Sequence, residues 1–328
     1  MAIMVAGGAG YIGSHTVREL LERGEEVVVF DNLSKGHRAA VGGAKIYIGD
    51  LRDEAALDKV FRENEIESVI DFAASIEVGE SMKDPLGFYS NNVCSTVSLL
   101  KAMRKYGAKS IVFSSTAAVY GQPDELPITE RCAKRPQNAY GETKLAVEQM
   151  LKWCDNAYGI KYTCLRYFNA AGAHVSGEIG EDHAPETHLI PIVLQAAAGK
   201  RDKLYVFGSD YDTPDGTCVR DYIHVSDLAK AHLLALDAMR SGGGSAIYNL
   251  GNGKGFSVLE IIETAREVTG KAVPYELAQR RAGDPASLVA SSDKIRKELG
   301  WSPRFGLSDI IDTAWKWHSS HPSGYGNL

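Results

Sequence analysis

The chain has 328 residues, of which 44% are hydrophobic and 24% are charged, and its formal net charge is −6. These values are typical of a folded globular protein with one large or two modest domains. A net negative charge without a long basic run argues against nucleic acid or an anionic membrane surface as the main partner. No apolar stretch is long enough to cross a bilayer, so a membrane protein is not expected.

The chain begins with a short apolar strand and a glycine-rich turn. Residues 2–6 are apolar, Gly7, Gly10 and Gly13 follow at a spacing of three, and a helical pattern covers 11–23. Glycines in such a turn allow the backbone to approach a pyrophosphate and the helix to pack closely on the strand. The amino end of the helix then offers free N–H groups to the phosphates.

An acidic residue follows the next strand at the distance that a dinucleotide site requires. The apolar run 26–30 ends at Asp31, roughly 20 residues after the glycine turn. A carboxylate there accepts hydrogen bonds from the adenosine ribose and repels a 2′-phosphate, which favours NAD over NADP. The alternative is a glycine-rich turn of an ordinary α/β protein, and the order strand, turn, helix, strand and acid argues against it.

Strand-like and helical patterns alternate through the first half of the chain. This alternation, with apolar strands, predicts an α/β fold: a doubly wound parallel sheet of the Rossmann type. The expected strands are 2–6, 26–30, 45–48, 68–72, 110–114 and 161–166, and the expected helices are 11–23, 53–63, 92–106 and 138–158.

After Asn169 the pattern changes to long loops and shorter helices. The loops are 170–187 and 208–220, and the helices are expected near 188–199, 226–240, 257–269 and 306–318. This change predicts a smaller C-terminal α/β lobe. We therefore expect an NAD-binding domain over 1–170 and a substrate-binding lobe over 171–328, with segments that can interleave.

Tyr140 and Lys144 are the candidate catalytic pair. They stand four residues apart in a helical pattern and so share one helix face. A positive neighbour favours the phenolate form of a tyrosine, and a phenolate is a general base for a hydroxyl group. Thr116, at the end of the strand 110–114, can bind the same substrate oxygen. A surface pair and a Ser/Thr turn cap are the structural alternatives, and the upstream dinucleotide pattern favours catalysis.

These residues resemble the extended short-chain dehydrogenase/reductases and, within them, the UDP-glucose 4-epimerases. The resemblance covers nearly the whole chain and is carried by residues 7–15, 31–34, 78–81, 89–92, 114–121, 165–169, 219–225, 280–284 and 321–325. It implies that bound NAD oxidises C4 of a UDP-sugar to a 4-keto sugar, which rotates and is reduced again from its other face. UDP-glucose and UDP-galactose would thus be interconverted, with Tyr140 as base and Lys144 lowering the pKa of Tyr140 and contacting the nicotinamide ribose.

The resemblance also implies a set of ligand contacts. Cofactor contacts fall on Gly7, Gly10, Tyr11, Ile12, Gly13, Asp31, Asn32, Ser34, Asp50, Leu51, Phe72, Ala73, Asn91, Tyr140, Lys144 and Phe168. Contacts with the UDP-sugar fall on Thr116, Asn169, Leu189, Arg220, Arg281 and Asp284. Forked arginine side chains suit a diphosphate, and an aspartate suits ribose hydroxyls.

The chain departs from the family pattern at three places. Many bacterial members carry a lysine in the stretch that matches residues 75–77, and this chain has none. His188 stands where an asparagine is frequent. Leu288 occupies a position linked to acceptance of N-acetylated sugars such as UDP-GlcNAc and UDP-GalNAc, and a leucine leaves that acceptance open.

Three other functions compete with this one. A sugar-nucleotide 4,6-dehydratase needs an acid–base pair just after Thr116, where this chain has Ala117 and Ala118. An epimerase of UDP-pentoses or UDP-uronates is opposed only by the C-terminal motifs. A non-enzymatic NAD-binding regulator would be marked by loss of Tyr140 or Lys144, and both are present.

Cysteine and histidine usage bears on location and on metals. The cysteines at 94, 132, 154, 164 and 218 have no paired or metal-like spacing, which favours a reducing cytoplasm, and no signal peptide is expected. No metal site is expected, because His318 and His321 have no partner cluster and His174, His183 and His188 lie in a loop region. The resemblance implies a homodimer through the helices 92–106 and 138–158.

Overall fold

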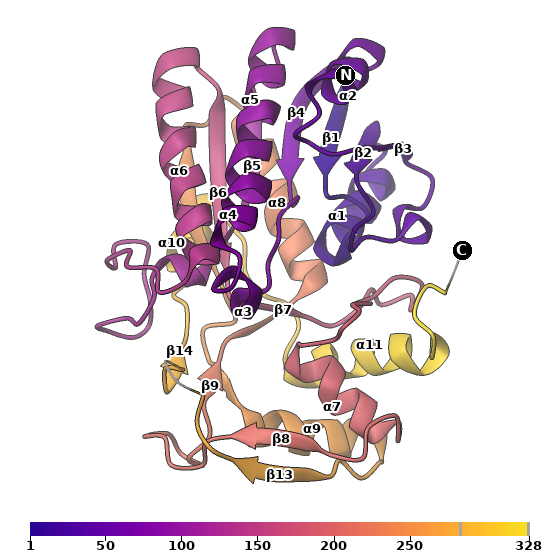
Figure 1. Cartoon of the computed structure of the whole chain (residues 1–328), viewed down its shortest axis with the longest axis vertical. Helices are drawn as coiled ribbons and strands as arrows, with labels where there is room; N and C mark the ends of the chain where they lie inside the picture. The colour runs from indigo at the N-terminus through magenta and orange to yellow at the C-terminus, as the bar shows by residue number, and fades with distance from the viewer. Residues whose placement is uncertain (282–283, 327–328) are drawn as a thin grey trace.

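The computed structural model describes residues 1–281 and 284–326 (Figure 1). Its largest element is a seven-stranded sheet in the order β11-β6-β5-β4-β1-β2-β3, in which every neighbouring pair is parallel. The strands are β1 (Ala2–Ala6), β2 (Val27–Asp31), β3 (Lys45–Ile48), β4 (Ile66–Asp71), β5 (Ser110–Thr116), β6 (Lys161–Tyr167) and β11 (Ala246–Leu250). The predicted doubly wound parallel sheet is confirmed.

Helices cover both faces of this sheet and form two separate cores. One core joins Leu57, Leu99 and Val147 to side chains of the strands, and the other contains Val17 and Leu228. Burial of these apolar stripes, rather than helix propensity, fixes the helices on the sheet. Over the first core lie α2 (Glu54–Glu63), α5 (Ser95–Tyr106) and α6 (Ala139–Tyr158), and over the second lie α1 (Tyr11–Glu22), α8 (Val225–Arg240) and α10 (Asp293–Leu299).

Short helical turns connect the main elements. They are η1 (Arg38–Val41), α3 (Val78–Ser81), α4 (Pro85–Phe88), the π-turn η2 (Tyr89–Cys94) and η3 (Ala117–Val119). The helix predicted over 92–106 is therefore α-helical only from Ser95. A π-turn widens the backbone locally and is frequent at functional sites, and this one carries Asn91, a predicted cofactor residue.

A smaller lobe packs below the carboxyl ends of the strands in Figure 1. Its core contains Leu194, Ile261 and Ile310, which come from α7 (Leu189–Ala197), α9 (Val258–Thr269) and α11 (Leu307–Ser320). Its short strands pair as β7 (Asn169–Ala171) with β10 (Tyr222–His224), β9 (Val219–Arg220) with both β12 (Phe256–Ser257) and β14 (Ser287–Leu288), and β8 (Leu204–Phe207) with β13 (Tyr275–Ala278).

The two halves of the chain are interleaved in space. After building β9 and β10, the chain returns to the main sheet through α8, and β11 then pairs with β6. Neither β11 nor α10 was expected from the sequence pattern. The division into 1–170 and 171–328 stays a prediction. Residues 171–328 supply β11, α8 and α10 to the lobe that contains the main sheet.

Candidate active site

The predicted cofactor residues lie where the strand order changes direction. β1 lies between β2 and β4, so the connections leaving β1 and β4 depart on opposite sides of this point. Ligands of open α/β sheets bind at such a switch point, beyond the carboxyl ends of the strands. The loops after Ala6, Asp31 and Asp71 meet there.

The glycine turn after β1 has no room for a side chain at Gly7 or Gly13. Gly7 has φ +71°, and a Cβ built on it would lie 2.7 Å from the Ala73 nitrogen. A Cβ on Gly13 would lie 2.2 Å from the Gly7 carbonyl oxygen. The turn therefore packs directly against the loop after β4 and against α1, as a dinucleotide turn requires.

The amino end of α1 is free to accept a phosphate. Its N-cap residue Gly10 contributes no side-chain hydrogen bond, and the first turn contains no acidic residue. Tyr11 and Ile12, both predicted cofactor residues, form that turn, and the Tyr11 hydroxyl donates a 2.5 Å hydrogen bond to the Gly172 carbonyl. An uncapped helix N-terminus with no acidic neighbour fits an anionic diphosphate.

Asp31 ends β2 as an almost fully buried carboxylate. Its two oxygens accept backbone N–H groups from Ala9, at 2.9 Å, and from Leu33, at 2.8 Å. Burial raises the pKa of Asp31, and these two hydrogen bonds oppose the shift. A carboxylate has about four acceptor positions, so the two N–H groups leave capacity for ribose hydroxyls while they hold the side chain to the glycine turn.

Two further loops carry cofactor residues beside Asp31. Ser34 donates its backbone N–H to the Asn32 side chain at 3.0 Å, and both residues are exposed. Asp50 follows β3, where Arg52 pairs with it at 2.6 Å and holds the pKa of Asp50 at about 2. The adjacent Leu51 is buried. The loop after β3 therefore carries one charged side chain that is partly exposed and one apolar side chain that is packed inside.

The loop after β4 is fastened by the π-turn. Asn91 donates to the Ser75 hydroxyl at 3.1 Å. Asn92, which sequence reasoning did not single out, is 2% exposed and exchanges hydrogen bonds with the Ser75 backbone, at 2.8 Å and 3.0 Å. The Phe72 ring lies 4.6 Å from the ring of His232. The loop after β4 is therefore held by the π-turn at Ser75 and by the His232 ring at Phe72.

Thr116 and Tyr140 come together at the end of β5. Thr116 is 8% exposed, and its hydroxyl accepts the Ala118 N–H at 3.1 Å, so it also caps η3. Tyr140 lies in the first turn of α6, whose amino end is capped by Asn138. Burial raises the pKa of Tyr140 to about 12, and the Thr116 hydroxyl opposes that shift.

Lys144 is buried one turn further along α6. Its ammonium donates to the Ser114 carbonyl at 2.8 Å and lies 4.7 Å above the Phe113 ring. Burial lowers the pKa of Lys144 to about 8, and the carboxylate of Asp71 opposes this shift. The sequence predicted that Lys144 lowers the pKa of Tyr140. In the structure burial raises the pKa of Tyr140, and the Lys144 ammonium is directed to Ser114. The lowering of the Tyr140 pKa by Lys144 stays a prediction.

A buried ion pair supports this helix from behind and was missed by sequence reasoning. Glu148 pairs with Arg166 of β6 at 2.5 Å, and both side chains are 2–3% exposed. Ser115 donates to Glu148, and the other side of Arg166 donates to the Tyr120 hydroxyl at 2.7 Å. The spacing 140, 144 and 148 was the available signal, because these three residues share one helix face.

The predicted substrate residues other than Thr116 fall into two groups in the smaller lobe. Arg220 forms an ion pair with Asp284 and lies opposite Leu288 in the pairing of β9 with β14. The exposed Arg281 lies with its guanidinium 4.0 Å from the centre of the Phe207 ring.

The remaining substrate and cofactor residues line the start of the lobe. Asn169 donates to the Asp221 carbonyl at 2.9 Å, and Leu189 begins α7. Phe168 packs on the cluster of Val119, Tyr120 and Ile128 beside Thr116. Hydrogen bonds from the backbone of Asn252, Gly253 and Ala290 to Asp221 tie these loops together.

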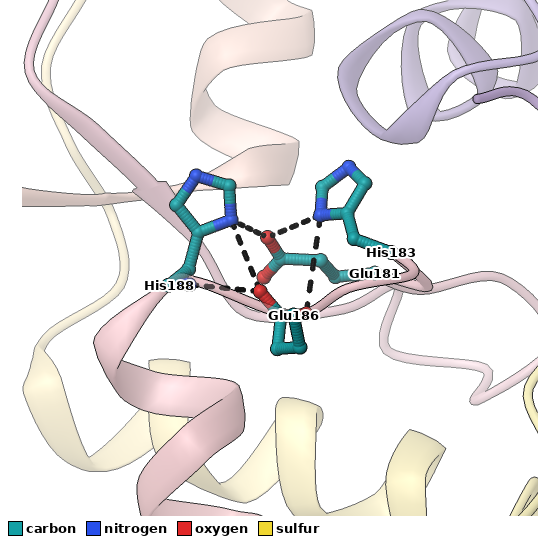
Figure 2. Close-up of side chains that lie close together, drawn as sticks. All are labelled: Glu181, His183, Glu186 and His188. Atoms are coloured by element: carbon teal, nitrogen blue, oxygen red, sulfur yellow. Dashed lines mark hydrogen bonds and ion pairs between the residues drawn. The ribbon is translucent and has the colours of Figure 1, made fainter. Parts of the chain in front are cut away.

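The loop between β7 and α7 differs from the sequence-based expectation. His183 and His188 were expected to lie in a loop region and to form no metal site, and the structure brings them together with Glu181 and Glu186 in an arrangement that could hold a metal ion (Figure 2). Within the described ranges, no helix combines the length and the apolar character needed to cross a membrane.

Comparison with known proteins identifies the family. The model of the NAD dependent epimerase/dehydratase family matches residues 3–251. The chain belongs to this family. Its members are named for the cofactor that the glycine turn, α1 and Asp31 are built to hold, so the predicted NAD site is consistent with membership.

Relatives in the family match over the full length. A UDP-glucose 4-epimerase of Halalkalibacterium halodurans is 58% identical over 326 residues, which cover 99% of this chain and 98% of the relative. A crystal structure of a UDP-glucose 4-epimerase has a TM-score of 0.98 and 54% identity and covers 100% of both chains. The Bifidobacterium longum UDP-glucose 4-epimerase, solved with NAD⁺ and UDP, has a TM-score of 0.94 and 43% identity and covers 99% of this chain and 100% of its own.

Proposed function

We propose that this chain is an isomerase that interconverts UDP-glucose and UDP-galactose and keeps NAD bound throughout. The observation that carries the proposal is the placement of Thr116, Tyr140 and Lys144 at the carboxyl end of β5, in the parallel sheet whose β1 leads into the uncapped amino end of α1. Full-length relatives at 58% identity are UDP-glucose 4-epimerases. The 4,6-dehydratase alternative finds no support, because Ala117 and Ala118 leave no acid–base pair after Thr116.

The cofactor site is proposed to divide its work among three elements. The amino end of α1 binds the diphosphate, Asp31 binds the adenosine ribose, and the loop after β4 borders the nicotinamide half. Bound NAD supplies the reversible oxidation at C4 of the sugar. Tight retention follows from the number of loops that surround the site, and it suits a cofactor that is restored in every turnover.

Tyr140 is proposed to exchange the proton of the sugar 4-hydroxyl through its Oη. As a phenolate it would take the 4-hydroxyl proton during oxidation, and as the resulting phenol it would return a proton to the C4 oxygen during reduction. Burial raises its pKa to about 12, so the phenolate needs added positive charge at the site. Thr116 presents a second hydroxyl to the same oxygen. Lys144, protonated below pH 8, holds the carbonyl end of β5 and carries positive charge beside the nicotinamide ribose.

The smaller lobe is proposed to hold the UDP part of the substrate. Arg220 and Arg281 suit a diphosphate because each guanidinium offers paired donors to phosphate oxygens. Asp284 orients Arg220 through their ion pair and can accept from ribose hydroxyls. Asn169 and Leu189 border the sugar, and Leu288, next to Arg220 in register, borders the site at the position linked to N-acetylated sugars.

An assay without added nicotinamide tests the function. Purified protein is mixed with UDP-galactose, UDP-GalNAc or UDP-xylose, and the products are separated. We expect UDP-glucose from UDP-galactose with no external NAD. A 4-keto-6-deoxy product would indicate a dehydratase, exclusive conversion of UDP-xylose would indicate a pentose epimerase, and no product from any sugar would indicate a regulator.

We further propose that the chain forms a homodimer in the cytoplasm. The side chains of Trp153 and Tyr158 in α6 are exposed, and so is that of Leu86 in α4, which is 81% exposed. α4 shortly precedes η2 and α5 in the chain. These exposed apolar side chains support an apolar contact between two copies of the chain. All five cysteines are free thiols, as expected in a reducing compartment. Light scattering of the wild type and of Trp153→Arg tests the dimer, which should dissociate in the variant.

A further inference from the structure

Four side chains near the start of α7 converge on one point (Figure 2). Nδ1 of His188 lies 2.7 Å from Oε1 of Glu181 and 3.4 Å from Oε1 of Glu186. Nδ1 of His183 lies 3.2 Å from Oε1 of Glu181 and 3.9 Å from Oε2 of Glu186. Ligand atoms placed about 2.0–2.2 Å from a tetrahedral Zn²⁺ stand about 3.3–3.6 Å apart. The 3.2 Å and 3.4 Å contacts are close to that spacing, whereas the 2.7 Å contact of His188 with Glu181 is shorter and the 3.9 Å contact of His183 with Glu186 is longer. One atom from each side chain lies within 4.8 Å of the others, so small shifts would bring four ligands around one ion.

The two carboxylates of this group also suit a cation. The side chains of Glu181 and Glu186 are only 4% and 6% exposed. Over residues 1–281 and 284–326, the only side chains that form ion pairs with either carboxylate are His183 and His188. Two neighbouring buried carboxylates repel each other strongly unless positive charge lies between them.

Two details favour coordination over a plain hydrogen-bond network. Nδ1 of His183 is buried and makes no hydrogen bond, although Glu181 lies within 3.2 Å of it. Oε1 of Glu186 is fixed by the backbone N–H groups of Thr187, at 2.7 Å, and His188, at 2.8 Å. One imidazole nitrogen is thus left for a ligand, and one carboxylate is oriented by its own backbone as ligating carboxylates usually are.

We infer that Glu181, His183, Glu186 and His188 form a binding site for one divalent transition-metal ion. Two imidazole nitrogens and two carboxylate oxygens suit Zn²⁺ or Co²⁺, whereas Mg²⁺ and Ca²⁺ prefer oxygen alone. The His188 side chain is 47% exposed, which gives the ion a path from solvent. This inference does not depend on the proposed function.

The position of the site gives the ion a structural role. The His183 ring meets the Tyr11 ring edge to face at 6.3 Å, and Tyr11 begins the helix proposed to bind the cofactor diphosphate. His188 precedes Leu189, the first residue of α7. A bound ion would therefore fasten the loop that lies between the cofactor helix and the substrate lobe.

Metal binding by the full-length protein tests the inference. Protein freed of its purification tag and treated with a chelator is titrated with Zn²⁺ in a calorimeter and with Co²⁺ in a spectrophotometer. We expect one ion per chain and the visible absorption of tetrahedral Co²⁺ with nitrogen and oxygen ligands. Absence of saturable binding to the folded wild type would overturn the inference, and so would a sulfur-to-cobalt band, because it would place the ion on cysteines.

Two variants and a matched control locate the ion. Loss of a residue that hydrogen-bonds a metal ligand lowers metal affinity by roughly 10–100-fold. His188→Gln and Glu186→Gln remove the ligands themselves, so each should weaken metal binding at least ~100-fold. His321→Gln, a histidine outside the group, should bind as the wild type does. His188 is half exposed, so its variant is expected to fold, which circular dichroism checks. Wild-type affinity in a folded His188→Gln variant would contradict the assignment.

Discussion

The end of β5 and the loop between β7 and α7 are built in opposite ways. At the end of β5, Thr116, Tyr140 and Lys144 stand on a strand and a helix, and the buried pair of Glu148 and Arg166 supports them. In the loop, the charged side chains between Glu181 and His188 pair with one another, while Trp317 and Tyr325 hold the loop from the C-terminal segment. The first arrangement is fixed by the sheet before any ligand binds. The second depends partly on pairing among its own charged side chains, so an ion or a proton can alter it.

The largest effect is expected at Tyr140. Tyr140→Phe removes the only phenol proposed to exchange the C4 hydroxyl proton while it leaves the ring and its packing. We expect turnover of UDP-galactose to fall by roughly 10³–10⁴-fold, the upper range for loss of a general acid–base group. Binding of UDP-sugar, measured by calorimetry, should persist. The control is Tyr205→Phe, the same change at an exposed tyrosine of β8, which should keep full activity.

The second largest effect is expected at Glu148, and it is a loss of stability rather than of turnover. Glu148→Gln leaves the Arg166 guanidinium buried without its carboxylate, and breaking such a pair costs roughly 3–5 kcal/mol. Chemical denaturation should show this loss in the free energy of unfolding. Glu142→Gln, on the exposed side of the same helix, should change it by less than about 1 kcal/mol. Equal effects of the two changes would mean that the buried pair does not support α6.

The third effect is expected in the smaller lobe. Asp284→Asn removes the carboxylate that holds Arg220, so the arginine loses its orientation for a diphosphate. We expect KM for UDP-galactose to rise by roughly 10-fold or more, with a much smaller change in kcat. Steady-state kinetics separates the two. A fall in kcat at constant KM would place Asp284 with the catalytic residues instead.

A change in the pH profile is expected from Asp71. This carboxylate is buried, and its charge helps to hold the pKa of Lys144 at about 8 against burial. Asp71→Asn removes that support, so the Lys144 pKa falls and the ammonium is lost at lower pH. The alkaline limb of kcat/KM should therefore move down by about one pH unit. A shift to higher pH, or no shift, would show that Lys144 does not control this limb.

The smallest effect is expected on the surface. Lys35 and Glu77 form a 3.0 Å ion pair between the loops that follow β2 and β4. Both side chains are partly exposed, and such pairs contribute about 0–1 kcal/mol. Glu77→Gln should raise the rate of NAD release only slightly. NAD release from the folded protein, followed by fluorescence at low and high salt, measures it.

Local spacing explains what the sequence could predict. Gly7, Asp31 and the pair of Tyr140 and Lys144 act through short stretches of chain, so their arrangement follows from strand and helix geometry. Nearly all main helices and strands were placed within a few residues for the same reason. The β11 strand and α10 were missed because neither carries a clear apolar pattern: β11 contains the buried polar Asn249, and Ile295 is the only buried residue in α10.

Contacts between distant segments explain what could not be predicted. Glu148 meets Arg166 only because α6 lies on β6, and no spacing rule gives the partner of a buried charge. The pKa of Tyr140 depends on burial, which the sequence does not report, so the rise of that pKa to about 12 was not expected. His183 and His188 join Glu181 and Glu186 through the path of a loop, and helix or strand periodicity says nothing about such a path.

The fate of the hydrogen on C4 tests the central claim most directly. UDP-galactose that carries deuterium at C4 is converted in ordinary water without added nicotinamide, and the UDP-glucose formed is analysed by mass spectrometry and NMR. If Tyr140 moves only the hydroxyl proton, and the retained cofactor returns to C4 the deuteride that it removed, the product keeps its deuterium at C4. Replacement of that deuterium by hydrogen from water would contradict the account.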